Sequence, residues 1–192
     1  MALSRPTRRV LGPALFALIA GIGLAACDPP ATRPDACNGI IRAVTVEDVH
    51  VPSGATCRLE GTRVDGNVTI ARNGTLRASG VRVDGNVQSQ GHTLVTVRDN
   101  SRVEGSIQLE AGGEVQVADS RIDGNVQLEA NRAKAGVARN IVGSDVQLFD
   151  NRGALASGNW IDGNLQCKGN NPAPTGGGNV VNGNKEDQCR RL

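Results

Sequence analysis

RVDGNV stands at residues 63–68 and again at 82–87. Near copies read RVEGSI at 102–107 and RIDGNV at 121–126, and weaker matches continue as IVGSDV, WIDGNL and VVNGN. The aliphatic residue in second place recurs every 19 or 20 positions, at Val64, Val83, Val103, Ile122, Val142, Ile161 and Val181. A fixed period of this length indicates one structural unit stacked on itself, so this repeat decides the fold.

Within one repeat the pattern is that of short β-strands. Aliphatic and polar residues alternate in IQLE (107–110) and again in EVQV (114–117). Gly, Asn, Asp and Ser separate such runs, and no sustained helical period follows residue 45. One coil per repeat predicts an all-β, single-stranded parallel β-helix of about seven coils with 19–20 residues each. Leucine-rich repeats share the period, but their leucine-dense signature is absent.

The N-terminus is typical of an exported protein. Arg5, Arg8 and Arg9 precede an uncharged apolar stretch at 11–26, which is short for a transmembrane helix. This stretch runs into LAAC (24–27), which resembles the lipobox of bacterial lipoproteins. The resemblance implies that 1–26 is a lipoprotein signal peptide and that Cys27 is lipidated, which would anchor the chain to a bacterial membrane on its periplasmic or cell-surface side. An ordinary cleaved signal peptide is the alternative.

The rest of the chain is long enough for one domain. We expect a lipidated linker and N-terminal cap at 27–42, a β-helix at 43–189 with its C-terminal cap at about 167–189, and a tail at 190–192. The formal charge of +2 includes three signal-peptide arginines, so cleavage leaves 18 basic residues (21 less 3) against 19 acidic ones. That balance favours no nucleic-acid partner. Phe149 and Trp160 are the only aromatic residues after residue 26, which disfavours sites that stack ligands on rings.

Four further cysteines bracket the repeats: Cys37 and Cys57 at the start, Cys167 and Cys189 at the end. They allow three pairings, of which a one-dimensional stack favours Cys37–Cys57 and Cys167–Cys189. Each bond corresponds to about 3 kcal/mol in the loop-entropy account. A metal site is the rival interpretation, but CxxC spacing and neighbouring histidines are lacking, and His50 and His92 are expected to be isolated and exposed. We therefore expect no metal and no cofactor.

The repeated phrase also predicts two columns of charge on one outer face, because its arginine and its acid flank an inward aliphatic residue. A bare acidic column would repel itself and invite calcium. Each acid, however, has an arginine two residues away and another one coil away, so we expect structural pairing, with a calcium or substrate site as the alternative. The columns are Arg63, Arg82, Arg102 and Arg121, beside Asp65, Asp84, Glu104, Asp123 and Asp162.

Two amide columns are expected to be architectural, because stacked side-chain amides bond to one another and to corner backbone. The glutamine column is the better binding candidate of the two, since it is expected to be flat and exposed. The first column contains Asn67, Asn86, Asn125, Asn164 and Asn184, with Ser106 and Asp145 as variants; the second contains Gln88, Gln108, Gln127, Gln147 and Gln166.

The charged face changes near the end of the array. The positions equivalent to Arg121 become Ile141, Trp160 and Val180, and Phe149 takes an outward position equivalent to Glu129. An exposed apolar patch usually marks a contact. We expect the chain's own tail, 170–192, to cover it, because Cys189 draws the tail back; a partner protein or self-association is the alternative.

The coil pattern resembles the right-handed parallel β-helix proteins. The segment LQCKGNNPAPTGGGNVVNGNKEDQC (165–189) is similar to the ending of uncharacterised exported bacterial β-helix proteins. The resemblance covers roughly residues 40–189 and brings no catalytic residue with it. Pectate-lyase-like enzymes of this architecture place their chemistry on long loops beside a groove, whereas the coils here are nearly uniform, and the longest irregular corner is 169–179.

These features together favour a non-enzymatic, membrane-anchored envelope lipoprotein that acts as a rigid structural or interaction scaffold. We expect a monomer whose partner is an envelope protein or a glycan. A glycan-binding or glycan-cleaving β-helix protein that uses the Asp/Arg face is the alternative. End-to-end assembly through uncapped coils is a third hypothesis, against which the cysteine-pinned ends argue.

Overall fold

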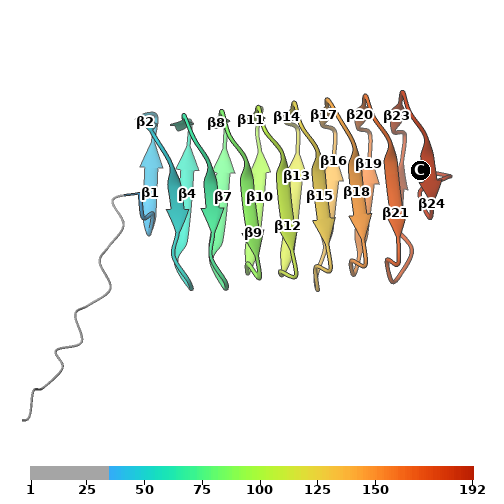
Figure 1. Ribbon diagram of the computed structural model, residues 1–192, viewed down its shortest axis with the longest axis horizontal. Coiled ribbons are helices and arrows are strands. Elements are labelled where there is room, and N and C mark those ends of the chain that lie inside the picture. Colours follow the sequence, from blue (N-terminus) through green and yellow to red (C-terminus); the bar gives the residue numbers. More distant parts are fainter. Residues whose placement is uncertain (1–34) are drawn as a thin grey trace, which may run out of the picture. The chain divides into compact units, whose positions relative to one another are not determined.

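The structure is a computed structural model that describes residues 35–192, and these form a parallel β-solenoid (Figure 1). Neighbouring strands in each of its three sheets come from successive coils and run parallel. Each sheet has eight strands, so the solenoid has about eight coils where the aliphatic repeat indicates about seven. The extra coil is the first, in which Thr45 and Val46 lie in register with Arg63 and Val64 without the glycine and asparagine of the phrase.

The first sheet in each coil carries the longest strands, of up to five residues. Its inward and outward positions alternate, as the sequence predicted. Its strands are β1 (Gly39–Arg42), β4 (Thr56–Glu60), β7 (Thr75–Ser79), β10 (Leu94–Arg98), β13 (Glu114–Ala118), β16 (Ala135–Ala138), β19 (Ala154–Ser157) and β22 (Thr175–Gly177).

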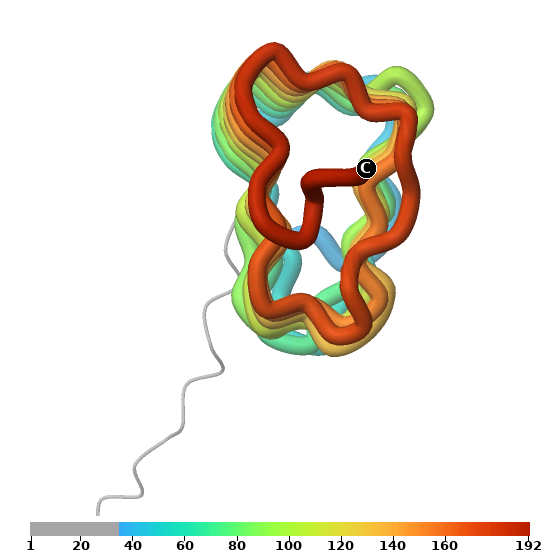
Figure 2. Tube along the Cα trace, turned by 90° about the vertical axis from the view of Figure 1, so that its right-hand side faces the viewer, coloured from blue at the N-terminus to red at the C-terminus, as the bar shows by residue number. Residues whose placement is uncertain are grey.

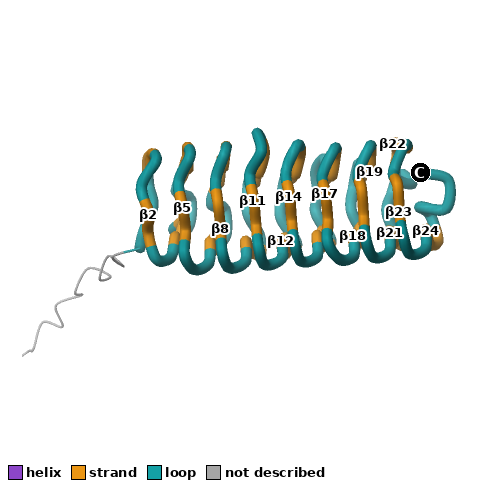
Figure 3. Tube along the Cα trace, turned by 90° about the horizontal axis from the view of Figure 1, so that it is seen from above, coloured by secondary structure: helices purple, strands orange, loops and turns teal. Residues whose placement is uncertain are grey.

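The second sheet holds the arginine and the aliphatic residue of the repeated phrase, and every strand in it has two residues. Figure 3 shows these strands following one another along the stack. They are β2 (Thr45–Val46), β5 (Arg63–Val64), β8 (Arg82–Val83), β11 (Arg102–Val103), β14 (Arg121–Ile122), β17 (Ile141–Val142), β20 (Trp160–Ile161) and β23 (Val180–Val181).

The third sheet follows the Gly-Asn corner of the phrase. It consists of β3 (Val49–Val51), β6 (Val68–Ile70), β9 (Val87–Gln90), β12 (Ile107–Glu110), β15 (Val126–Glu129), β18 (Val146–Phe149), β21 (Leu165–Lys168) and β24 (Lys185–Asp187).

The core is a column of aliphatic side chains from all three sheets. Along the second sheet Val64, Val103 and Ile122 have no exposed surface, and Val181 in the last coil is partly buried. Burying one such side chain contributes about 1.5–3 kcal/mol. The coils stack directly on one another (Figure 2). Because every coil repeats the same inward positions, the buried side chains form one continuous core.

The glycine of the phrase is required by the close approach of successive coils. A Cβ on Gly85 would lie 2.5 Å from the carbonyl oxygen of Gly66, and one on Gly105 would lie equally close to the carbonyl of Gly85. Neither contact leaves room for a side chain. The glycine therefore allows the corners to stack at the spacing that the strands impose.

Two buried asparagine ladders hold the other corners, and the sequence analysis did not identify them. Asn159 shows the two contacts that recur along each ladder. Its Nδ2 donates to the carbonyl of Val137 at 2.9 Å, and its Oδ1 accepts the backbone N–H of Asn140 at 3.0 Å. The members recur at the same 19- or 20-residue spacing as the phrase. One ladder contains Asn140, Asn159 and Asn179; the other contains Asn131, Asn151 and Asn170.

His92 is buried, with only 3% of its surface exposed, so the expectation that it is exposed was wrong. Its ring lies against Gly112 of the next coil, where a Cβ would come within 2.2 Å of Cε1. Neither ring nitrogen has a hydrogen-bond partner in the structure. Burial lowers the pKa of His92 to about 4, because desolvation disfavours the charged imidazolium. The imidazole is therefore neutral at neutral pH.

Both disulfides are present as predicted, Cys37–Cys57 near one end and Cys167–Cys189 near the other, with Cα atoms 5.4 and 5.2 Å apart. The first coil includes β1, which lies wholly within 27–42, the range expected to be linker and cap. Cys27 and the expected signal peptide lie outside the described residues. Residues 35–192 include no helix able to span a membrane.

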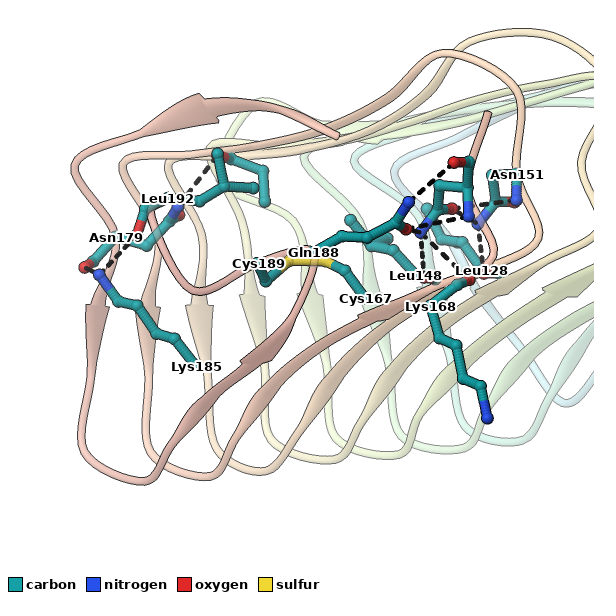
Figure 4. The surroundings of a disulfide bond; sticks show 12 residues. Leu128, Leu148, Asn151, Cys167, Lys168, Asn179, Lys185, Gln188, Cys189 and Leu192 are labelled. Atoms are coloured by element: carbon teal, nitrogen blue, oxygen red, sulfur yellow. Dashed lines mark hydrogen bonds between the residues drawn. A yellow bond between two sulfur atoms is a disulfide. The ribbon is translucent and has the colours of Figure 1, made fainter. Parts of the chain in front are cut away.

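The tail closes the C-terminal end of the core and does not cover the apolar face, which corrects our expectation. The chain turns inward across the last coil (Figure 2), and Cys189 is fully buried while Leu192 packs on the core. Lys185 Nζ donates to the carbonyls of Asn179 and Leu192 at 2.8 and 2.5 Å (Figure 4). Gln188 ends one asparagine ladder, accepting the N–H of Asn170 at 3.0 Å.

Candidate functional site

The charged columns of the second sheet pair with each other as expected. Arg63, Arg82 and Arg102 each reach the acid of their own coil and the acid of the next. Arg102 Nη2 lies 2.8 Å from Asp123, and Arg121 Nε lies 2.7 Å from the same carboxylate. The hydrogen bond to Asp65 raises the pKa of Arg63. The network comprises Arg63 with Asp65 and Asp84, Arg82 with Asp84 and Glu104, Arg102 with Glu104 and Asp123, and Arg121 with Asp123.

This pairing leaves the acids of the first four phrases with arginine partners, so the structure supports charge neutralisation over a bare calcium-binding column. Among residues 35–192, no group of three or more His, Cys, Asp or Glu side chains is arranged to hold a metal ion. Asp162 is the acid that the network does not reach. Its carboxylate accepts a hydrogen bond from Asn182 Nδ2 at 2.8 Å.

The two amide columns also stack as expected. In the corner column, Asn67 Oδ1 accepts the backbone N–H of Asn86 at 2.9 Å, and the same contact continues from Asn86 to Ser106. Asn125 and Asn164 take part farther along, through Asp145. In the glutamine column each amide donates to the next, and the column ends on the carboxylate of Glu186 at 3.0 Å. The side-chain amides of each column are therefore hydrogen-bonded within that column.

The apolar column lies on the same face of the second sheet, directly after the ion-pair network. Ile141, Trp160 and Val180 are adjacent in register on β17, β20 and β23. Their exposed fractions are 41%, 52% and 60%, which are high for large apolar residues. We call these three residues the apolar column. It is uncovered in the described part of the chain.

A shallow hollow of about 230 Å³ opens beside this column, lined by Arg121, Ile141, Val142, Gly143, Trp160 and Asp162. It exists because one coil lacks both charged residues of the phrase: Ile141 replaces the arginine and Gly143 replaces the acid. Asp162 consequently has an apolar residue on its own coil and on the coil before it. The hollow therefore combines an exposed indole, a guanidinium and a carboxylate.

A second hollow of about 440 Å³ shares Arg121 and Ile141 with the first. Arg139 borders it and donates to both carboxylate oxygens of Asp119 at 2.7 Å. This hydrogen bonding lowers the pKa of Asp119 and raises the pKa of Arg139. The pair makes a polar margin for the apolar column.

Phe149 does not belong to the apolar column. It lies on β18 in the third sheet, in register with Glu129 and Lys168, and its side chain is half-buried. Ile141, Trp160, Val180 and Phe149 were expected to form one contact surface, but they lie on two different faces. The face with Trp160 is the one on which large apolar side chains are exposed.

Sequence reasoning missed a further hollow of about 480 Å³ on the outer face of the first sheet. Gly136 stands there in register between Gln116 and Leu155, and its missing side chain leaves a gap. Pro172 and Ala173 of the long corner border the same space. The signal was available in the sequence as a glycine in an outward strand position, next to the longest irregular corner.

No protein-family model, curated protein or solved structure matches this chain. The residues themselves therefore carry the functional argument.

Proposed function

We propose that this protein is a non-enzymatic, lipid-anchored envelope protein whose rigid solenoid presents the apolar column to a partner protein. The observation that carries the proposal is the exposure of Trp160, 52% of its surface, on a face whose earlier coils are covered by ion pairs. Exposed apolar patches with polar margins are typical of protein–protein contacts. Tryptophan and arginine are also common among residues that dominate binding energy.

The self-contained character of the other columns supports a scaffold rather than an enzyme. Asp84, Glu104 and Asp123 each contact two arginines, so their carboxylate oxygens are already engaged in ion pairs along the stack. The asparagine and glutamine ladders likewise bond along the stack. Chemistry on this surface would have to break contacts that hold the coils together.

The composition of the hollow also indicates the partner's chemistry. Trp160 and Ile141 offer apolar surface, and Asp162 makes no ion pair among the described residues, since Arg121 of the same hollow pairs with Asp123. A complementary partner presents apolar side chains next to a lysine or arginine, since buried charges require partners. We propose an envelope protein with such a segment.

Site-specific photo-crosslinking in intact cells tests this proposal. A crosslinker at position 160 should give one adduct of defined mass, while a crosslinker at position 82, on the same sheet within the charged half, should give none. The variant Trp160→Ser, probed from position 180, should lose the adduct without losing thermal stability. Equal labelling from positions 82 and 160 would contradict the proposal. An adduct with the mass of two copies would also contradict it, because it would show that the apolar column contacts a second copy of this chain.

Membrane anchoring is tested separately through Cys27, which lies outside the described residues. We propose that its thiol carries lipid, as the LAAC segment suggests. Labelled fatty acid should enter the wild-type protein and not the Cys27→Ser variant, and that variant should leave the membrane fraction. Retention of label after the substitution would exclude lipidation at this residue.

Glycan binding is a second candidate, favoured by the same hollow. Sugar sites commonly combine an aromatic ring with a carboxylate, and here Trp160 and Asp162 line one hollow. A glycan ligand predicts that Asp162→Asn weakens binding to purified envelope polysaccharide, while Asp84→Asn, in the paired network, leaves it unchanged. Absence of polysaccharide binding by the wild-type protein would remove this candidate.

A further inference from the structure

A second column of arginines lies on the outer face of the first sheet, in the early coils. Arg58 on β4 and Arg77 on β7 are exposed and directly in register, and Arg98 on β10 is in register with Ser79. Neighbouring strands lie about 4.8 Å apart, so the two guanidinium groups project from adjacent rungs. We call this place the arginine hollow; it measures about 320 Å³ and is lined by Arg58, Glu60, Arg77, Ala78, Ser79 and Arg98.

The acids near the arginine hollow already have other partners. Glu60 accepts from Arg42 Nε at 2.8 Å. Asp99 lies 3.3 Å from Arg98 and accepts the Ser79 hydroxyl at 2.7 Å. Within residues 35–192, the guanidinium groups of Arg58 and Arg77 make no ion pair and no hydrogen bond.

The second sheet provides an internal comparison. Its arginines stack with the same period, yet every one of them contacts at least one acid. Like charges that face each other on neighbouring strands destabilise a sheet unless something neutralises them. Around the arginine hollow, four arginines including Arg42 meet two carboxylates, which leaves an excess of two positive charges. A bound anion would neutralise this excess charge.

We propose that the arginine hollow binds a phosphate group. Guanidinium forks match phosphate oxygens and bind them with charge-assisted hydrogen bonds. Arg58 and Arg77 project from adjacent rungs, and Arg98 lies at the side of the hollow, so three forks can each take a different oxygen of a tetrahedral anion. A planar carboxylate is satisfied by a single fork and would leave at least one guanidinium unpaired.

The phosphate group comes from a lipid head group or from a soluble molecule. The lipid source rests on the proposed anchoring at Cys27, which precedes Cys37 by only ten residues in the sequence. The soluble source is independent of anchoring. Phosphate binding itself can therefore be tested whether or not the anchoring proposal holds.

The test is calorimetric titration of the full chain, purified in a neutral detergent, with inorganic phosphate at low ionic strength. The variant Arg58→Gln/Arg77→Gln should weaken binding by at least about ten-fold, since it removes two charge-assisted contacts. The control Arg63→Gln/Arg82→Gln removes the same charge from two arginines that are likewise in register on neighbouring strands, in the paired column, and should bind phosphate as the wild type does. Equal losses in both double variants, or no binding by the wild type, would overturn the proposal.

Adding phosphatidylglycerol to the same micelles separates the two sources. Competition with phosphate that disappears in Arg58→Gln/Arg77→Gln assigns the hollow to a lipid head group. Phosphate binding without competition assigns it to a soluble phosphate compound. Melting curves of each variant confirm that a loss of binding does not come from unfolding.

Discussion

The two halves of the second sheet share one backbone and differ in what covers it. From β5 to β14 the outer positions hold an arginine–acid network, whereas from β17 to β23 they hold Ile141, Trp160 and Val180. Both halves bury the same inward aliphatic column. The comparison teaches that the inner half of the repeated phrase builds the solenoid, while its outer half is free to be changed for contact.

The strongest test of this comparison is to truncate the core beneath each half. Ile122 lies under the charged half and Ile161 under the apolar half, and neither has exposed surface. Ile122→Ala and Ile161→Ala should each lower the free energy of unfolding by about 2–5 kcal/mol. Urea denaturation measures both. A large difference between them would mean that the outer columns contribute to the core's stability, contrary to the separation described above.

Acidification is expected to weaken the protein through His92, which lies in neither half. Its folded pKa of about 4 is below the ordinary value of 6.5, so the unfolded chain binds the proton first as pH falls. Stability should fall from pH 6.5 to pH 4, by about 3 kcal/mol in all.

The matched variant is His92→Asn, because asparagine occupies the corresponding corner position at Asn131. Denaturation at pH 7.5 and pH 4.5 should show a smaller acid loss in the variant than in the wild type. Identical acid losses in the two proteins would show that His92 is not the group responsible.

Breaking the ion-pair network should have a modest effect on stability. Asp123→Asn removes the acid that contacts both Arg102 and Arg121, and exposed pairs contribute about 0–1 kcal/mol each. The loss should shrink as salt is added, because screening weakens the pairs in the wild type. Asp162→Asn, in the half without arginine partners, is the control and should show no salt dependence. The same salt dependence in both variants would contradict the assignment of the network to one half.

Extending the charged half into the apolar half should change stability least. Ile141→Arg restores the arginine of the phrase one coil before Asp162, where the network pattern predicts a new ion pair. As a surface change it should shift the free energy of unfolding by no more than about 0.5 kcal/mol. The photo-crosslink from position 160 should nevertheless disappear, because the charged side chain fills the hollow. A preserved crosslink would argue that the partner does not use this hollow.

The sequence alone determined the parallel β-solenoid, because the inward positions of a coil that stacks on itself must repeat with its period. The aliphatic residue that recurs from Val64 to Val181 every 19 or 20 positions therefore predicts the stacked coils. Cys37–Cys57 and Cys167–Cys189 followed from the same one-dimensional order. The pairing of Arg63, Arg82, Arg102 and Arg121 followed too, since the register places Asp84, Glu104 and Asp123 each between two arginines.

Tertiary structure decided what depends on how corners and ends fill space. It buried His92 beneath Gly112, where sequence reasoning expected exposure, because corner packing has no two-residue alternation to reveal it. It sent the tail over the end of the core and left Trp160 uncovered, since the last coil had an open apolar end to close. It also showed that, among residues 35–192, Arg58 and Arg77 have no acid as a partner, because Glu60 and Asp99 bond to other groups. Local spacing sets the coils, and only the folded chain settles which surfaces remain to be bound.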